Sequence, residues 1–134
     1  MKARYLLDAS AIYPLVLALK AQLLDYAELF ATLDLAFYEV GNIVWKGHRR
    51  GHVRDPLAVI GLFQEVFDAI HVLRISRELM QDVLKLAIDE GLTFYDASYL
   101  YVSRTLGLKL VSEDSDLRRY PQSISVEELL EELE

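Results

Sequence analysis

Short apolar runs alternate with longer amphipathic segments along this chain, and no other feature of the sequence limits the fold as strongly. The runs have the length of buried strands, and the segments between them have the periodicity of helices. Strands that are buried on both faces read as continuous apolar runs, which is typical of a parallel sheet covered by helices. We therefore predict an α/β fold, a three-layer α/β/α sandwich with a central parallel sheet.

Turn and cap residues set the expected bounds of the elements. Gly91 and Gly107 follow helical segments and are suitable C-terminal stops, and Pro56 suits the first turn of a helix. The expected strands are Arg4–Leu7, Leu35–Phe37, Val72–Ile75, Leu108–Val111 and, at an edge, Ser123–Ser125. The expected helices are Ala9–Lys20, Leu23–Leu33, Tyr38–Arg50, Asp55–Ile70, Ser76–Glu90, Phe94–Leu106, Ser115–Arg119 and a final acidic helix capped by Ser125.

Length and composition favour one domain, residues 1–134, with a core of its own. The 134 residues contain no internal repeat, low-complexity tract or linker. Without cysteine the chain has neither disulfides nor thiolate metal sites. Hydrophobic residues make up 53%, which is rich for a small soluble domain and predicts apolar surface that is left over for a partner.

The charge balance and the N-terminus narrow the function further. A formal net charge of −7 is unfavourable for non-specific nucleic-acid binding, which requires a basic surface. It is compatible with a metal-dependent site, in which cations meet the phosphate. Lys2 and Arg4 precede an apolar stretch as in a signal peptide, but Asp8 interrupts it. Ala9–Leu19 is too short to span a bilayer, so we expect a soluble, cytoplasmic protein.

Acidic residues follow two of the expected strands. Asp8 comes directly after the first strand, and Asp114 and Asp116 come just after the fourth. In open parallel sheets ligands bind outside the carboxyl ends of the strands. Glu39 and Asp96 lie in first turns of expected helices. Their aromatic and aliphatic neighbours in FYEV and FYDA predict that both acids are partly buried.

Each acid has a structural explanation when it is taken alone. Asp8 and Asp114 suit helix N-caps, and Glu39 suits the helix dipole. Asp96 stands three residues after Thr93, which is close to a capping box. Together they would be costly to bury without a partner. A hard divalent cation is the expected neutraliser, because Mg²⁺ and Mn²⁺ prefer oxygen ligands. The histidines are scattered and have no zinc-ligand spacing; they are His48, His52 and His71.

The ordered set YLLDAS, FYEVGN, LTFYDASYL and LVSEDSDL strongly resembles the PIN-domain nucleases, in particular the VapC toxins of toxin–antitoxin pairs. The resemblance covers essentially the whole chain. It implies a PIN-like sandwich with strand order 3-2-1-4-5. It also implies a Mg²⁺- or Mn²⁺-dependent endoribonuclease that is inhibited by a cognate antitoxin and forms a homodimer or a higher homo-oligomer.

The resemblance also assigns roles to individual residues. The conserved catalytic and metal-binding acids of the family correspond to Asp8, Glu39, Asp96 and Asp114. Asp116 matches a more variable extra acid, for which the resemblance implies a role in metal binding. The polar positions beside the ligands correspond to Ser10, Asn42 and Ser112. Ser112 departs from the family pattern, which usually has Thr there.

A basic segment and an apolar segment are the expected contact surfaces. The cations of the segment from Lys46 to Arg54 either are solvated and suit the dipole at a helix C-terminus or bind RNA phosphates. The expected RNA contacts are Lys46, Arg49 and Arg50. The stretch Ile12–Phe30 is more apolar than surface helices require, which predicts a groove for an amphipathic partner. Tyr13 and Tyr26 are the candidates for exposed residues within it.

Other readings belong to different classes of protein. A phospho-acceptor receiver domain is disfavoured because Asp68 lies in a helix and Lys109 lies inside a strand. A haloacid-type phosphatase requires a second Asp where Ser10 stands. An RNA-processing PIN nuclease without an antitoxin and a catalytically silent PIN-fold binding module remain alternatives.

Overall fold

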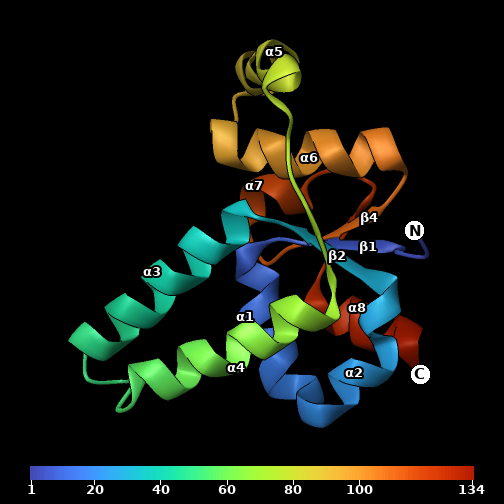
Figure 1. Cartoon of the computed structure of the whole chain (residues 1–134). Helices are drawn as coiled ribbons and strands as arrows, with labels where there is room; N and C mark the ends of the chain where they lie inside the picture. The colour runs from blue at the N-terminus through green and yellow to red at the C-terminus, as the bar shows by residue number, and fades with distance from the viewer.

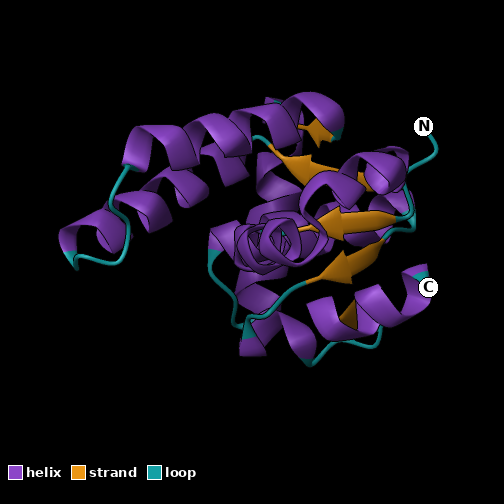
Figure 2. Cartoon of the chain, turned by 90° about the horizontal axis from the view of Figure 1, so that it is seen from below, coloured by secondary structure: helices purple, strands orange, loops and turns teal.

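A computed structural model describes residues 1–134 and contains a five-stranded parallel sheet in the order β3-β2-β1-β4-β5. The strands are β1 (Tyr5–Leu7), β2 (Phe30–Leu33), β3 (His71–Leu73), β4 (Lys109–Val111) and β5 (Ser123–Ile124). The strand arrows in Figure 2 point the same way. The predicted α/β/α sandwich and its strand order 3-2-1-4-5 are thereby confirmed.

Helices cover both faces of this sheet. They are α1 (Ala9–Leu19), α2 (Leu23–Tyr26), α3 (Leu35–Arg49), α4 (Pro56–Ala69), α5 (Met80–Glu90), α6 (Phe94–Leu106), α7 (Ser115–Arg118) and α8 (Val126–Leu133). Figure 1 shows α6 against one face with α5 outside it, and α1, α2, α4 and α8 on the other side. No helix has both the length and the apolarity that a membrane span requires.

The alternation of side chains along β1 explains why its sequence is apolar throughout. Tyr5 and Leu7 point into the core that α1, α4 and α8 complete, and Leu6 points into the core beneath α6. All three are buried. A strand with a core on each side has no solvent face, so it needs no polar alternation.

The prediction for the second strand is wrong. The sequence predicts a helix over Leu23–Leu33 and a strand over Leu35–Phe37, whereas β2 is Phe30–Leu33 and α3 already begins at Leu35. The run Phe-Ala-Thr-Leu is short and wholly apolar except for one Thr, so periodicity does not distinguish strand from helix there. Parallel pairing with β1, in the register Tyr5↔Phe30, decides in favour of a strand.

Helices α3 and α4 form a hairpin that extends away from the sheet, as Figures 1 and 2 both show. Phe37 of α3 meets Phe67 of α4 edge-on, with ring centroids 4.8 Å apart. Gly51 allows the tip of the hairpin to turn with a φ of +78°, and the Asp55 side chain caps α4. The hairpin places the basic segment after Lys46 at the end of α3 far from the sheet.

Caps that the sequence predicts are mostly present. Ser125 and Glu128 form the expected capping box at the start of α8. Ser76 makes no capping hydrogen bond with its side chain, and α5 begins at Met80 after a 3₁₀ turn over Arg77–Leu79. The helix predicted over Ser76–Glu90 is therefore shorter than expected at its N-terminus.

Candidate active site

The candidate site forms where the carboxyl ends of β1 and β4 meet the first turns of α3 and α6. Asp8 follows β1, and Ser112 and Asp114 follow β4. In Figure 1 the starts of α1, α3, α6 and α7 lie toward the same side of the sheet. A helix that returns the chain between two parallel strands begins at their carboxyl ends, which is how Glu39 and Asp96 reach the same region.

Asp96, Asp114 and Asp116 are the closest group of carboxylates. Each offers one oxygen, and these oxygens all lie within 4.8 Å of one another. Asp114 caps the short helix α7, and its Oδ1 accepts a hydrogen bond of 2.8 Å from the Asp116 backbone N–H. Its own backbone N–H donates to Ser112 Oγ at 3.0 Å. The turn after β4 thus fixes the Asp114 carboxylate and the backbone that carries Asp116.

Asp8 is 4% exposed, and its carboxylate is held by three neighbouring donors. Its Oδ1 accepts from Ser10 Oγ at 2.6 Å and from the Ala11 backbone N–H at 3.0 Å. Its Oδ2 accepts from Ser112 Oγ at 2.5 Å. Burial nevertheless raises the pKa of Asp8 to about 6, and the nearby charge of Glu39 adds to the rise. The structure places Ser10 and Ser112 beside an acid, where the motifs expect them.

Glu39 is half-buried and is held by a residue that the sequence analysis does not identify. The Tyr99 hydroxyl donates to Glu39 Oε1 at 2.9 Å, and Tyr99 itself is fully buried in α6. Burial raises the pKa of Glu39, the Tyr99 hydrogen bond opposes that rise, and the charge of Asp96 adds to it. Burial and the Glu39 charge raise the pKa of Tyr99 above its ordinary value, so its hydroxyl remains a donor.

Asp96 connects the close group with the other acids. Burial raises its pKa to about 6, and the charges of Asp114, Asp8 and Asp116 contribute in that order. No lysine or arginine neutralises these carboxylates. The ion pairs of the chain are Lys2–Glu28, Arg104–Glu90 and Lys109–Glu132, all outside the site. A set of converging oxygen donors with uncompensated charge fits a hard divalent cation.

The remaining predicted residues lie outside this hydrogen-bond network. Asn42 is exposed on α3 and makes no hydrogen bond to a site acid, and Lys46, Arg49 and Arg50 are exposed at the far end of α3. The missed Tyr99 has a signal in the sequence, because it stands three residues after Asp96 on one helix.

Thr32 is the other residue that the sequence analysis missed. It is buried in β2, and its Oγ1 donates to the Leu7 carbonyl at 2.7 Å. The sequence does not indicate a role for Thr32, because its pattern predicts a helix over that segment.

Comparisons with known proteins agree with this fold. The sequence profile described as the PIN domain matches residues 5–122. The curated protein Exonuclease VapC9 of Pyrobaculum aerophilum is 40% identical over 131 residues, which are 97% of this chain and 96% of that protein. Ribonuclease VapC3 of the same organism is 32% identical over 130 residues, 91% of this chain and 98% of that protein.

The chain therefore belongs to the PIN domain family. Both curated relatives carry the VapC name, which confirms the resemblance that the four motifs predict.

Solved structures support the same fold. The crystal structure of PAE2754 from Pyrobaculum aerophilum superposes with a TM-score of 0.89 at 40% identity and covers 99% of this chain and 98% of that one. A toxin–antitoxin complex from Klebsiella pneumoniae gives a TM-score of 0.64 at 14% identity, with 91% and 97% covered. Mycobacterium tuberculosis VapC20, titled a sarcin-ricin loop cleaving toxin, gives 0.61 at 14%, with 86% and 93% covered. At 14% identity these two structures bear on the fold alone.

Removing one charge from the site is expected to change the pH dependence of stability. The pKa of Asp96 rises from 3.8 to about 6 on folding, so the folded state binds more protons than the unfolded chain in that range. The contribution of Asp96 is therefore complete below pH 3.8 and is lost as pH rises through 6. In metal-free buffer at pH 7.5, Asp96→Asn should raise the free energy of unfolding by about 1 kcal/mol, once solvent screening is allowed for.

Thermal melts of wild type and variant from pH 4 to 8 measure this difference, which should shrink toward pH 4. Adding millimolar Mn²⁺ should stabilise the wild type, because a cation that binds only the folded state shifts the unfolding equilibrium. The shift should be smaller in Asp96→Asn. The exposed Asp25 of α2 is the control, and Asp25→Asn should retain the full Mn²⁺ shift. A wild type that Mn²⁺ does not stabilise would contradict a cation site.

The chain offers a matched pair of tyrosines for testing the role of Tyr99. Tyr5 and Tyr99 are both buried, and each donates one hydrogen bond to a glutamate, Glu132 and Glu39 respectively. Phe at either position keeps the packing and removes the hydroxyl. Tyr99→Phe should lower Mn²⁺ affinity about tenfold, because it releases a carboxylate beside the ligands. Tyr5→Phe should leave that affinity unchanged in the same calorimetric titration, and equal affinities in both variants would exclude a role for Tyr99 at the site.

Proposed function

We propose that this protein is a metal-dependent endoribonuclease, which hydrolyses RNA phosphodiesters and serves as the toxin of a type II toxin–antitoxin pair. The observation that carries the proposal is the group of carboxylates without a basic partner at the carboxyl ends of the strands. Membership of the PIN domain family supports it, as do the ribonuclease and exonuclease names of the curated relatives.

Asp96, Asp114 and Asp116 would hold Mg²⁺ or Mn²⁺, with Asp8 and Glu39 completing the negative site. A bound ion would supply an activated water for in-line attack and would stabilise the leaving oxygen. Ser10 and Ser112 keep the Asp8 carboxylate oriented through hydrogen bonds. Tyr99 does the same for Glu39.

The negative charge of the site also makes the binding of a phosphodiester depend on a bound cation. A phosphodiester carries a negative charge, and the site carboxylates form no ion pair with a lysine or arginine. Without a cation the carboxylates repel the phosphate, so binding of substrate at the site depends on metal. This dependence explains how a chain with net charge −7 can act on RNA.

Cleavage of circular RNA separates internal from terminal attack. One curated relative is called an exonuclease, and the name of the other, a ribonuclease, does not specify the mode of attack. An endoribonuclease should convert circular single-stranded RNA to linear product in Mn²⁺, and Asp96→Asn should reduce the rate at least about a hundredfold. Gel electrophoresis of circular and linear forms of one sequence measures this. If only the linear form is digested, the enzyme attacks RNA ends, and its activity is that of an exonuclease.

The basic residues at the outer end of α3 are proposed to contact RNA phosphates. Lys46, Arg49 and Arg50 are exposed there, and the Arg49 guanidinium lies 5.3 Å from the Trp45 ring centroid. Replacing these three residues with Ala should weaken RNA binding and flatten its dependence on salt concentration, because each phosphate contact releases counterions. Turnover of bound RNA should change much less, since the substitutions lie outside the carboxylate group.

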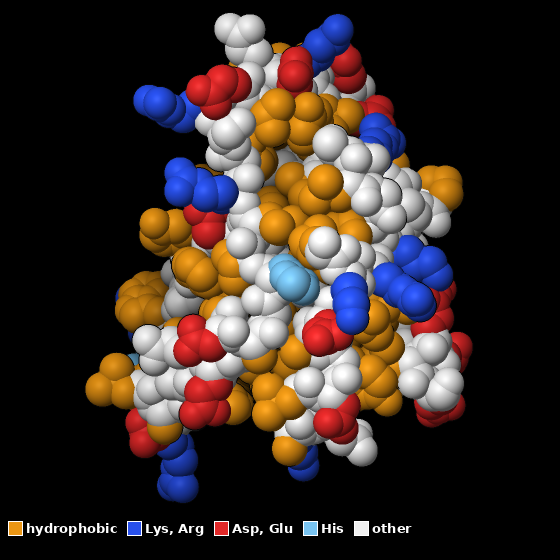
Figure 3. Space-filling view, turned by 45° about the vertical axis from the view of Figure 1, so that its right-hand side comes forward, with side chains coloured by type: hydrophobic (Ala, Val, Ile, Leu, Met, Phe, Trp, Pro, Cys, Tyr) orange, Lys and Arg blue, Asp and Glu red, His pale blue; other side chains and the backbone are white.

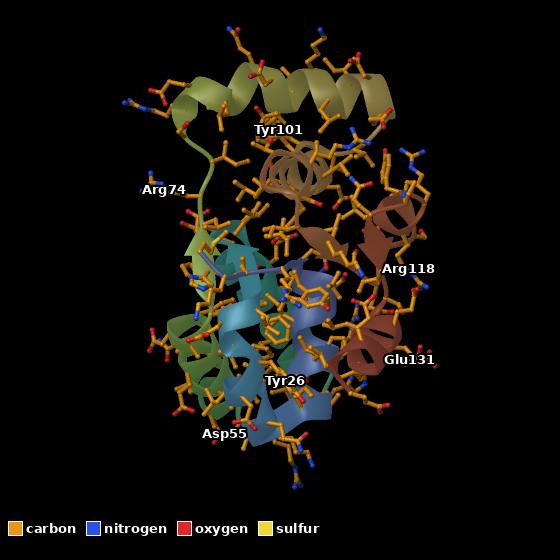
Figure 4. The ribbon with its side chains drawn as sticks, turned by 90° about the vertical axis from the view of Figure 1, so that its right-hand side faces the viewer. Tyr26, Asp55, Arg74, Tyr101, Arg118 and Glu131 are labelled. Carbon is orange, nitrogen blue, oxygen red and sulfur yellow. The ribbon has the colours of Figure 1, made fainter.

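A second triple variant controls for total charge. Arg74, Arg77 and Lys85 are exposed on the connection to α5 and on α5 itself, and Figure 4 labels Arg74 on that connection. Their replacement with Ala removes the same number of charges elsewhere. Fluorescence anisotropy measures how RNA affinity depends on salt concentration in each variant. If this dependence is the same in both triple variants, the basic end of α3 acts only through net charge.

An apolar groove between α1, α2 and α4 is the proposed docking site for the antitoxin. Its lining residues are mostly apolar and include Val16, Leu17, Ala21, Leu23, Leu24, Leu62 and Val66. Leu17, Leu24 and Leu62 are exposed, with Leu24 at 65%. In Figure 3, apolar side chains lie between charged ones over much of the visible face. An amphipathic segment would cover such a groove with its apolar side.

Tyr13 and Tyr26 are not the exposed residues of this region, so that prediction is wrong. Tyr13 stacks on Phe63 with ring centroids 5.5 Å apart. Tyr26 packs against the core, its hydroxyl donates to the Leu133 carbonyl at 3.4 Å, and Figure 4 shows it among the lower helices. Both rings pack against other residues of the fold and are not free to contact a partner.

Leu24→Asp should therefore weaken capture of the antitoxin encoded beside this gene, by about tenfold or more, because it places a charge in an apolar contact. The Mn²⁺-induced rise in melting temperature should remain, since the groove is separate from the carboxylates. Leu106→Asp alters an exposed leucine outside the groove and should bind as wild type. A pull-down and a melting curve on each variant measure the two effects, and equal binding by both variants would exclude the groove.

A further inference from the structure

Glu113 is an acid of the turn after β4, residues 112–116, that does not belong to the close group of carboxylates. That group consists of Asp96, Asp114 and Asp116. The Glu113 Oε1 atom instead accepts a hydrogen bond of 2.7 Å from the backbone N–H of Val126, the first residue of α8. The chemistry proposed for the carboxylates makes no use of this contact between the turn and α8.

The backbone of Glu113 belongs to the hydrogen-bond network that holds Asp8. Its N–H donates to Ser10 Oγ at 2.9 Å, and Ser10 Oγ donates in turn to Asp8 Oδ1 at 2.6 Å. The next N–H of the chain, that of Asp114, donates to Ser112 Oγ at 3.0 Å. Glu113 therefore connects two parts of the molecule: its backbone lies in the network of the site, and its side chain reaches α8.

Helix α8 is itself fixed against the two strands that carry the site. Its residues Val126 and Leu129 are buried in the core on the α1 side of the sheet, where Figure 1 shows α8. Near its C-terminus, Glu132 accepts hydrogen bonds from the Tyr5 hydroxyl of β1 at 2.8 Å and from Lys109 Nζ of β4 at 2.8 Å. A helix that is held to β1 and β4 in this way is a firm support for a turn that follows β4.

The start of α8 favours a carboxylate acceptor. The first N–H groups of a helix have no partner within the helix. The capping box accounts for the N–H groups of Ser125 and Glu128, and Glu113 accepts from the N–H of Val126. The positive end of the helix dipole stabilises a negative charge there, and an ionised acceptor makes the hydrogen bond stronger. The contact therefore holds the turn by more than packing.

We propose that Glu113 is a positioning residue, which ties the turn that carries Asp114 and Asp116 to α8 and thereby keeps these two acids in place for a cation. This inference rests on the proposed function, in which these acids hold Mg²⁺ or Mn²⁺. Carboxylates that converge on a cation repel one another in its absence. A contact that lies outside the group and opposes this repulsion preserves the geometry of the site until the cation binds.

Calorimetric titration of the full chain with Mn²⁺ tests this role. Glu113→Ala removes the acceptor and should weaken Mn²⁺ binding about tenfold, as expected for loss of a group that orients metal ligands. Glu113→Gln removes the charge but keeps an acceptor oxygen, so it should bind Mn²⁺ as wild type does. Equal losses in the two variants would overturn the proposal, because Glu113 would then act only through its charge. Unchanged affinity in Glu113→Ala would overturn it as well.

Glu128→Ala is the matched control. Glu128 also accepts one N–H at the start of α8, that of Ser125 at 3.1 Å, but this hydrogen bond lies within the cap of the helix. Both Ala variants should lower the melting temperature, because each removes one capping hydrogen bond. Only Glu113→Ala should also lose Mn²⁺ affinity. If Glu128→Ala loses as much affinity, the stability of α8 alone explains the effect, and the positioning role is refuted.

RNA cleavage at increasing Mn²⁺ concentration separates this inference from the proposed function. Glu113→Ala should need about tenfold more Mn²⁺ for half of its maximal rate. If no RNA is cut while Mn²⁺ affinity still depends on Glu113, the nuclease proposal fails and the positioning role stands. If RNA is cut and Glu113→Ala matches wild type in both Mn²⁺ affinity and rate, the nuclease stands and the positioning role is refuted. A wild type that binds no Mn²⁺ would refute the cation site and the positioning role together.

Discussion

The parallel pairing of β1 with β4 is the interaction on which the candidate site depends. Its register sets Leu7 opposite Val111, and the Asp8 backbone N–H donates to the Val111 carbonyl at 3.2 Å. Asp8 and Ser112 therefore leave neighbouring strands side by side, and the Ser112 hydroxyl reaches the Asp8 carboxylate. A slip of one residue would reverse the face to which every side chain of the strand points, so the two buried cores that hold this register also hold the site.

The same placement concentrates negative charge that the fold must tolerate. Burial raises the pKa of Asp8 and of Asp96 to about 6, so at neutral pH both are ionised at a cost to stability. Hydrogen bonds from Ser10 and Ser112 limit that cost at Asp8, and Tyr99 limits it at Glu39. Basic side chains do not remove it, because none of the ion pairs of the chain includes a site carboxylate. Destabilising a site locally so that a ligand restores the loss is common where function requires charge.

Surfaces of different chemistry are distributed around this site. The apolar groove lies between α1, α2 and α4, whereas the basic residues lie at the outer end of the α3–α4 hairpin. Exposed tyrosines mark the starts of α3 and α6. Because these surfaces come from different elements, single substitutions can separate partner binding, RNA binding and metal binding from one another.

Local signals in the sequence determined most elements and the identity of the acids. The helix Phe94–Leu106 was predicted with the observed bounds because Thr93 and Gly107 mark its ends, and the Ser125 capping box was predicted from residues three apart. Only the tertiary structure decided that Phe30–Leu33 is a strand, that Tyr99 reaches Glu39, and that Tyr38 and Tyr95 are exposed. Caps and periodicity depend on near neighbours in the chain. Strand pairing, burial and the meeting of carboxylates depend on residues far apart in sequence, whose proximity exists only once β1, β2 and β4 lie side by side.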